Sequence, residues 1–238
     1  MIILFLALAS LLGVSSTGTG LRPFSATVEM SFMDVTSEEE STSYAASLVG
    51  KYELSSSTVE AYGRLIRAAV SKEDNSRNWL GGLRYDRNVY GRKTRAYYFH
   101  QAESDPFAGI VQRDSDEVGI YQSLIDDDAE NLWIAEGGIR YMAVNPELAS
   151  NRYQTAGRVG SYYQRRLNNR LSADIDVEYI MNFTDTQMDL LNGQVSLGSS
   201  LTPLLFLKLN YLVQYQHQPF AGANDTSTFT SLNLLAQF

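Results

Sequence analysis

Acidic residues stand at every second position in one segment of the sequence: Asp174, Asp176 and Glu178. Side chains that alternate in this way point to one face of a β-strand, roughly 7 Å apart. Like charges at this spacing repel each other unless basic side chains or cations compensate them. We expect Arg158, in the preceding segment, to be the nearest partner, and Arg140 and Lys208 to reach the row from other segments. The row therefore either pairs fully or attracts cations.

Charged residues also alternate with apolar ones in the other extended segments. On the expected polar faces stand Glu29, Lys51, Glu53, Arg84, Asp86, Glu136, Arg140, Arg158, Asp174, Asp176, Glu178 and Lys208. We expect these side chains to line the lumen of a barrel. Charges of both signs in a narrow lumen tend to pair, because an unpaired charge away from bulk water is costly. The lining is thus either a structural network that closes the barrel or the wall of a narrow aqueous channel.

The sequence offers little for catalysis or for holding a cofactor. It contains no cysteine and two histidines, His100 and His217, neither of them in a Gly-x-Ser-x-Gly or comparable context. A catalytic nucleophile needs a base beside it. The acidic stretch at 126–130 lacks the glycine and the spaced ligands of a calcium loop, so we interpret it as a solvated turn. We predict no catalytic residue, no metal site, no cofactor and no enzymatic activity.

The elements that would position these residues are β-strands, because polar and apolar residues alternate in segments separated by short polar stretches. The expected strands are residues 24–35, 43–54, 59–71, 78–88, 94–103, 117–125, 132–144, 153–167, 171–183, 188–201, 206–216 and 226–238. Their number is even, and each is about as long as the 9–11 residues that a tilted transmembrane strand requires. In the clearest strand, 171–183, Ile180 alone breaks the alternation.

Alternation does not by itself show which face meets lipid, since a soluble barrel would carry the same pattern inverted. Near the strand ends the apolar face bears aromatic residues, as interfacial girdles do. These are Tyr52, Trp79, Tyr85, Trp133, Tyr141, Tyr179 and Tyr215. A twelve-stranded closed sheet is also hard to fill with side chains alone in a chain this short. We therefore predict that the apolar face contacts lipid.

The connections between the expected strands fall into two sets. Those at 55–57, 88–93, 126–131, 168–169 and 202–203 are short and polar. Those at 37–42, 72–77, 104–116, 145–152, 184–187 and 218–225 are generally longer. Short periplasmic turns and longer external loops are usual in outer-membrane barrels, so we expect both termini in the periplasm.

The two ends of the sequence also point to export. Residues 2–14 are an uninterrupted apolar run followed by small residues, which predicts a cleaved signal peptide at 1–20 and a mature barrel at 21–238, although no Lys or Arg precedes the run. The last strand sets Leu232, Leu234 and Phe238 on its apolar face. We expect these three residues to be the C-terminal signal that the barrel-assembly machinery recognises.

Several motifs resemble those of a known family, the uncharacterised outer-membrane barrels called salt-induced outer membrane proteins. They are Phe107-Ala108-Gly109 with Arg113, Gly119-Ile120-Tyr121, Glu136-Gly137-Gly138-Ile139-Arg140-Tyr141, and Asp225-Thr226-Ser227-Thr228. The chain departs from the family at 36–39, where members often carry Ser-Gly-Asn-Thr. The resemblance covers most of the mature chain and implies fold and location, and little about activity.

The sequence therefore predicts an all-β protein, a monomeric antiparallel transmembrane β-barrel of about twelve strands in the outer membrane of a Gram-negative bacterium. Its expected partners are outer-membrane lipid, lipopolysaccharide and the barrel-assembly machinery. A formal net charge of −8 argues against a nucleic-acid partner. The expected role is a narrow porin-like channel or a salt-responsive envelope-stress barrel. The alternatives are a closed structural barrel without transport and, less favoured, an outer-membrane enzyme.

Overall fold

The computed structural model describes residues 23–36, 41–70, 73–105, 110–127, 130–146, 150–184, 189–217 and 225–238. They form β1 (Phe24–Thr36), β2 (Ser41–Glu53), β3 (Ser57–Val70), β4 (Glu73–Tyr90), β5 (Thr94–Asp105), β6 (Ile110–Asp127), β7 (Asn131–Pro146), β8 (Arg152–Arg166), β9 (Leu171–Asn182), β10 (Leu190–Ser200), β11 (Leu205–Gln216) and β12 (Thr226–Gln237). Within these ranges no helix is long and apolar enough to cross a membrane. The predicted signal peptide and the acidic positions 38–40 lie outside the described residues.

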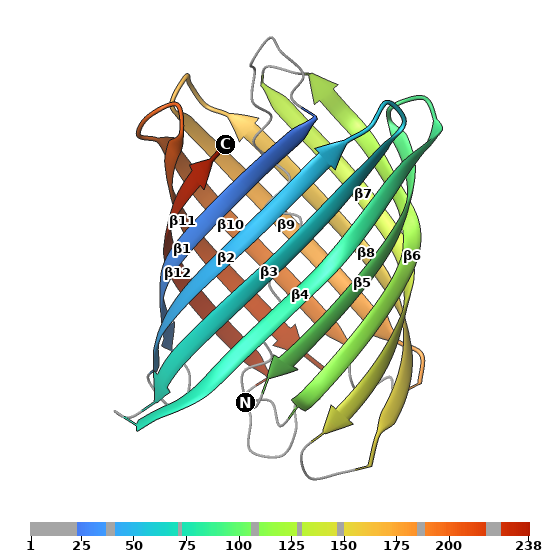
Figure 1. Ribbon diagram of the computed structural model, residues 1–238, viewed down its shortest axis with the longest axis vertical. Coiled ribbons are helices and arrows are strands. Elements are labelled where there is room, and N and C mark those ends of the chain that lie inside the picture. The colour runs from blue at the N-terminus through green and yellow to red at the C-terminus, as the bar shows by residue number, and fades with distance from the viewer. Residues whose placement is uncertain are drawn as a thin grey trace.

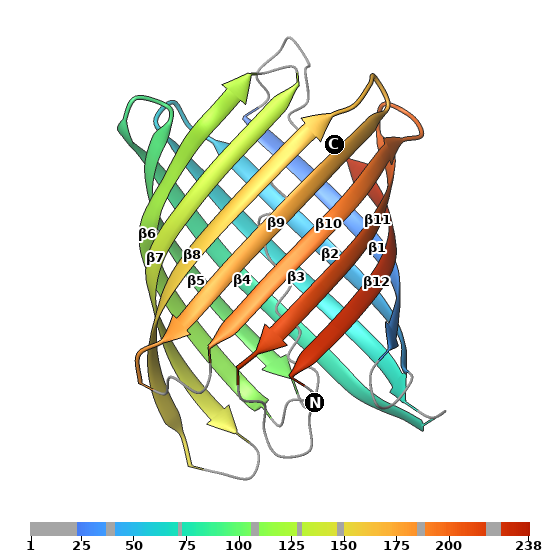
Figure 2. The ribbon, with the colours of Figure 1, turned by 180° about the vertical axis from the view of Figure 1, so that it is seen from behind.

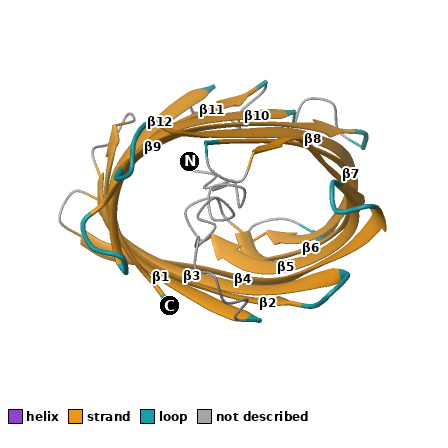
Figure 3. Ribbon diagram, turned by 90° about the horizontal axis from the view of Figure 1, so that it is seen from above, coloured by secondary structure: helices purple, strands orange, loops and turns teal. Residues whose placement is uncertain are grey.

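Each strand pairs with its neighbours in the sequence, and β12 pairs with β1, so that the sheet closes on itself (Figures 1 and 2). Seen from above, the strands form one continuous ring (Figure 3). Closure removes the two sheet edges and pairs the backbone groups that would otherwise lie open along them. The prediction of an all-β, twelve-stranded antiparallel barrel is confirmed.

The wall of the barrel has a polar inner face and an apolar outer face, and β9 shows the contrast most clearly. Asp176 is 3 % exposed, whereas its neighbour Val177 is 43 % exposed on the outer face. Ile180, which breaks the alternation of this strand, is buried on the inner face. There it joins an apolar cluster with Met142, Ala156 and Leu190. The exception in the sequence pattern is therefore an inward apolar residue and not a shift of register.

Two strands, β4 and β6, differ most from the prediction: each has 18 residues, where the ranges 78–88 and 117–125 were expected. β4 begins at Glu73, inside the predicted loop 72–77, and β6 begins at Ile110, inside the predicted loop 104–116. Asp114 and Asp116, expected in an external loop, therefore lie in a strand. Register shifts interrupt the pairing of β6 with β7 at two places. Each such β-bulge adds one residue to a strand and breaks the period-two pattern on which the prediction relied.

The connections at the end of the barrel where β1 begins and β12 ends are three or four residues long. Side-chain oxygens satisfy the turn amides there: Asn168 Oδ1 accepts a hydrogen bond from Leu171 N at 2.9 Å, and Thr202 Oγ1 from Leu205 N at 3.0 Å. Gly91, with φ of 59°, supplies the left-handed conformation in the turn after β4. The opposite connections range from two to nine residues, and only the last three are longer than the turns. The predicted asymmetry therefore holds for the later hairpins alone.

The seam between β1 and β12 closes the barrel along ten paired positions, from Thr27–Gln237 to Thr36–Thr228. Beyond them, Phe238 N donates to Ala26 O at 2.9 Å and Ala26 N donates to Phe238 O at 3.1 Å. The Phe238 side chain is exposed on the outer face, on the same side as Leu232 and Leu234. Phe238 thus contributes to closure through its backbone and to the outer surface through its ring.

Deleting Phe238 removes both backbone hydrogen bonds at this end of the seam, so we expect a smaller folded, heat-modifiable fraction after refolding into lipid vesicles. The Phe238→Ala variant keeps the two bonds and loses only the ring, and it separates closure from recognition of the aromatic side chain. A deletion variant that refolds with the yield and band shift of the wild type would contradict a closing role for this residue.

Candidate functional site

A continuous set of polar side chains on the inner face runs from β4 to β11. We call this set the polar belt. It consists of Arg84, Asp86, Tyr97, Glu117, Glu136, Arg140, Arg158, Glu178, Asn192 and Gln214. All ten residues are buried. The belt is the largest concentration of charge inside the described part of the barrel.

Arg158 on β8 is the centre of the belt. Its Nη1 lies 2.8 Å from Glu136 Oε2 and 3.4 Å from Glu117 Oε1, and its Nε donates to Glu178. Three carboxylates from β6, β7 and β9 thus share one guanidinium. A planar guanidinium with five N–H donors can serve several carboxylates at once, which an ammonium group does less well.

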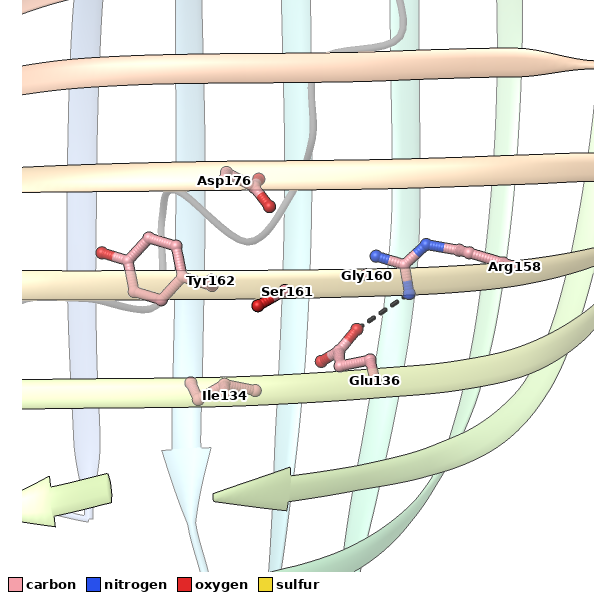
Figure 4. Close-up of a pocket in the computed structure, with 7 residues that line it drawn as sticks. All are labelled: Ile134, Glu136, Arg158, Gly160, Ser161, Tyr162 and Asp176. Atoms are coloured by element: carbon pink, nitrogen blue, oxygen red, sulfur yellow. Dashed lines mark hydrogen bonds and ion pairs between the residues drawn. The ribbon is translucent and has the colours of Figure 1, made fainter. Parts of the chain in front are cut away.

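Arg84 on β4 extends the belt to the other side. Its Nε and Nη2 donate to Asp86 at 3.1 and 3.0 Å, and Nη2 also lies 2.8 Å from Glu136 Oε1. The guanidinium carbon lies 4.4 Å from the centre of the Tyr97 ring. Glu136 therefore joins two arginines that come from strands on either side of it (Figure 4 shows its contact with Arg158).

Two glycines leave the space that this arrangement needs. Gly119 on β6 and Gly138 on β7 are paired in register and face inward. A Cβ at Gly138 would lie 2.6 Å from Tyr97 Oη and 2.9 Å from the Val118 carbonyl oxygen. The Tyr97 ring therefore lies across the two glycines, where its hydroxyl donates to Glu117 Oε1 at 2.5 Å. Tyr62 lies across Gly82 in the same manner and donates to Gln101 at 3.1 Å.

The acidic row of β9 is compensated unequally. Glu178 accepts from Arg158 and from Asn192 at 3.1 Å, and Asp174 has Lys208 Nζ at 3.2 Å. Arg140, the third candidate partner, lies 2.6 Å from Glu117 instead. Asp176, in the middle of the row, forms no ion pair within the described part of the chain. Among the described residues the row is therefore ion-paired at both ends and not at its centre.

The remaining residues that the sequence singled out lie apart from the belt. Lys51 and Glu53 form an ion pair of 2.6 Å near the end of β2, where their side chains are 30 % and 50 % exposed. Glu29 accepts hydrogen bonds from Ser47 at 3.3 Å and from Asn233. These contacts link β12, β1 and β2 and belong to the seam.

Sequence reasoning missed several inward residues, above all on β6 and its neighbours. Glu117 is 2 % exposed and takes part in the belt, and Arg113 pairs with Glu103 on β5. Glu60, 3 % exposed on β3, faces Arg84 across the strand pair. Arg113, Ser115 and Glu117 continue the alternation backwards from Val118, and that signal could have placed them on the polar face.

The two histidines and the acidic turn have local contacts only. On the outer face His100 Nδ1 lies 2.9 Å from Asp116 Oδ1, to which the Tyr98 hydroxyl also donates at 2.6 Å. The register neighbour of His100 on β4 is Leu83. Asp127 accepts hydrogen bonds from Glu130 N at 3.0 Å and from Asn131 at 3.2 Å, so it stabilises its own turn. Among the described residues, no group of three or more acidic or histidine side chains is placed to hold a metal ion.

Solved structures with the same fold are outer-membrane barrels. An outer-membrane channel from Pseudomonas putida F1 aligns with a TM-score of 0.64 at 10 % identity, over 92 % of this chain and 97 % of its own. The NanC porin aligns with a TM-score of 0.58 at 9 % identity, over 88 % of this chain and 98 % of its own. The translocator domain of the autotransporter NalP from Neisseria meningitidis aligns with a TM-score of 0.53 at 14 % identity, over 97 % of this chain and 92 % of its own. No curated protein matches the sequence.

These likenesses define the fold as a transmembrane antiparallel β-barrel. A family model matches residues 28–238, nearly the whole barrel, and the chain therefore belongs to DUF481, a family described as proteins of unknown function. The family membership covers all the strands of the polar belt.

Replacing Gly138 by alanine should displace Tyr97 and Glu117, because the added Cβ meets the tyrosine hydroxyl and a backbone carbonyl. We expect a loss of about 1–3 kcal/mol in the free energy of unfolding, typical of overpacking, measured by urea unfolding in lipid vesicles. Gly137 is the matched control, since a Cβ there would have its nearest contact, Arg158 O, at 3.8 Å. Equal stability of the Gly138→Ala and Gly137→Ala variants would contradict the role of Gly138 in seating Tyr97.

Proposed function

We propose that this protein is a narrow, porin-like channel of the outer membrane of a Gram-negative bacterium. The observation that carries the proposal is the inverted distribution of side chains in a closed barrel. Large apolar side chains such as Val177, Leu209 and Leu232 are exposed on the outer face, while charged and amide side chains fill the inner one. A hydrocarbon environment favours the first face, and an aqueous lumen favours the second.

The course of the polar belt supports an aqueous path. Its contacts join strands at most three positions apart around the ring, the widest being Arg84 to Glu136, from β4 to β7. Arg158 to Tyr97, at 3.5 Å, spans β5 to β8 in the same way. These hydrogen bonds and ion pairs thus follow the wall of the barrel.

The charge of the inner face favours cations. The belt and the acidic row together hold six carboxylates, Asp86, Glu117, Glu136, Asp174, Asp176 and Glu178, and four bases, Arg84, Arg140, Arg158 and Lys208. The carboxyl groups thus outnumber the bases by two. A lumen lined by an excess of one sign concentrates ions of the opposite sign.

The alternative is a closed structural barrel, which the extent of buried ion pairing favours. Arg158 with its three carboxylates holds β5 to β9 together whether or not solutes pass. Such a barrel would serve the envelope mechanically or under salt stress, without transport.

We further propose a monomer that contacts lipid and lipopolysaccharide through its outer face and is inserted by the barrel-assembly machinery through Leu232, Leu234 and Phe238.

Planar-bilayer recording of the refolded protein separates the two proposals. We expect a small single-channel conductance whose reversal potential in a KCl gradient indicates preference for K⁺ over Cl⁻. A preparation that inserts, shows heat-modifiable mobility and gives no conductance would instead establish the closed barrel. Anion preference in an open channel would contradict the assignment of the acidic residues to the pore wall.

The lipid-facing side is tested by arginine substitutions at two apolar outer positions. Val177→Arg places a charge on the membrane-facing wall, where it should cost about 2–4 kcal/mol near the bilayer midplane. Leu201→Arg, in the exposed turn after β10, is the control and should cost about 0–1 kcal/mol. Urea unfolding from vesicles measures both. Equal effects of the two substitutions would mean that the outer face does not meet hydrocarbon.

A further inference from the structure

Arg95, near the start of β5, is an inward-facing base without an acidic partner among the described residues. It alternates with Tyr97 and Phe99, which are buried on the inner wall, whereas Tyr98 is exposed on the outer face. The Arg95 guanidinium makes no ion pair or hydrogen bond with a described residue, and its Nε is buried. Other inner bases form ion pairs: Lys51 with Glu53, Arg84 with Asp86, Arg113 with Glu103, Arg140 with Glu117, Arg158 with Glu136 and Lys208 with Asp174.

The ring of Tyr121 on β6 orients this guanidinium. The two residues are paired in register, and Arg95 Cζ lies 5.3 Å from the centre of the ring. A cation within about 6 Å of an aromatic face is attracted to it. Contact with a ring uses the face of the guanidinium and does not consume the N–H groups at its edge, which bind carboxylate and phosphate. The position of Arg95 is therefore supported without an acid.

A second hydrogen-bond donor lies beside Arg95 on β4. Asn88 is its register partner, so the two Cα atoms are about 5 Å apart. Asn88 alternates with Arg84 and Asp86, both buried on the inner wall, and its carboxamide makes no hydrogen bond with a described residue. A guanidinium and a carboxamide side by side can donate to the same oxyanion.

The hairpin that carries both residues is basic. From residue 87 to residue 95 it contains no acid and four bases: Arg87, Arg92, Lys93 and Arg95. Acids on the neighbouring strands do not pair with Arg95, since Glu53 lies beside Lys51 and Asp86 beside Arg84. Asp126, near the end of β6, is exposed to solvent. A local excess of positive charge attracts anions even in a chain of net charge −8.

We propose that Arg95 and Asn88 bind one oxyanion group, a carboxylate or a phosphate, of a small solute at the end of the lumen where β4 turns into β5. The inference rests on the proposed function, because the solute must reach the inner face through water. A planar guanidinium and a flanking amide match the several acceptor oxygens of one such group. The acidic row of β9 lies four strands further round the wall.

Inorganic phosphate is the probe, and thermal unfolding measures its binding. The protein is refolded into vesicles of zwitterionic phosphatidylcholine and heated in sodium phosphate or in sodium chloride at equal ionic strength and pH. A ligand that binds only the folded state stabilises it, so at roughly ten times the Kd we expect a midpoint about 2–4 °C higher in phosphate. Phosphate also stabilises proteins non-specifically, and the variants provide that baseline.

Three variants locate the effect. Arg95→Gln should lose the rise beyond this baseline, whereas Arg170→Gln, which removes an exposed arginine from the turn after β8, should keep it. Both variants change the net charge equally. Asn88→Ala keeps the guanidinium and should show a smaller rise, and it provides the test if Arg95→Gln does not refold. Equal rises in the wild type and Arg95→Gln would overturn the site. So would a rise that Arg170→Gln abolishes or that Asn88→Ala leaves unchanged.

Vesicles that contain phosphatidylglycerol distinguish a solute in the lumen from a lipid headgroup. Because Arg95 faces the lumen, Arg95→Gln should change the midpoint in chloride by the same amount with either lipid. Stabilisation by phosphatidylglycerol that Arg95→Gln abolishes would mean that the arginine binds lipid, and it would overturn the lumen site.

The outcomes also distinguish this inference from the channel proposal. Stabilisation by phosphate that depends on Arg95, together with zero conductance, would remove the channel and leave an anion site at the end of a closed barrel. Conductance without phosphate-specific stabilisation would leave the channel and remove the site at Arg95.

Discussion

Closure of the sheet is the constraint on which the rest of this structure depends. Once β12 pairs with β1, every residue of a strand faces either inward or outward, and consecutive residues take opposite sides. Asp176 and Val177 are neighbours in the sequence, yet one is among the most buried residues and the other is on the outer surface. The β-bulges of β6 and of the β3–β4 pair are the places where the chain changes this assignment without opening the barrel.

The inner face then has to satisfy charges that cannot reach bulk water freely. Arginine is suited to this because the N–H groups of its guanidinium can bind carboxylates on two sides, as Arg84 does with Asp86 and Glu136. Removing one partner from such a set leaves a buried charge uncompensated. This typically destabilises a protein more than replacing the whole set by apolar residues does. The part of the inner wall on β10 to β12, where the belt ends, is lined largely by amides and hydroxyls such as Asn192, Gln194 and Asn233. The barrel therefore has one charged wall and one nearly neutral wall.

The proposed function depends on this asymmetry. In the proposed channel, a wall with excess carboxyl groups beside a nearly neutral wall would attract cations to one side of the lumen. Tyr62 and Tyr97, each lying across a glycine of the next strand, give this wall its shape. The two tyrosines hold Gln101 and Glu117 through their hydroxyls, so that packing and hydrogen bonding are fixed by the same side chains.

The fold class, the number of strands and the alternation of polar and apolar faces could be predicted from the sequence. Period-two alternation carries that information locally, and residues such as Asp174 and Val177 show it without any knowledge of their neighbours. The prediction failed at the two ends of β6, where register shifts interrupt the pairing, and the strand was expected to be half its length. Glu117 and Arg113 were missed although the alternation continues through them.

The tertiary structure alone decided which charges meet. Ion pairing depends on the register between strands and on how far a side chain extends around the curved wall. The sequence of a single strand contains neither. Arg140 therefore pairs with Glu117 rather than with the acidic row, and Arg84 reaches Glu136 across β5 and β6. The same geometry leaves Asp176 without an ion pair among the described residues, since Lys208 lies beside Asp174 and Arg158 pairs with Glu136 and Glu178.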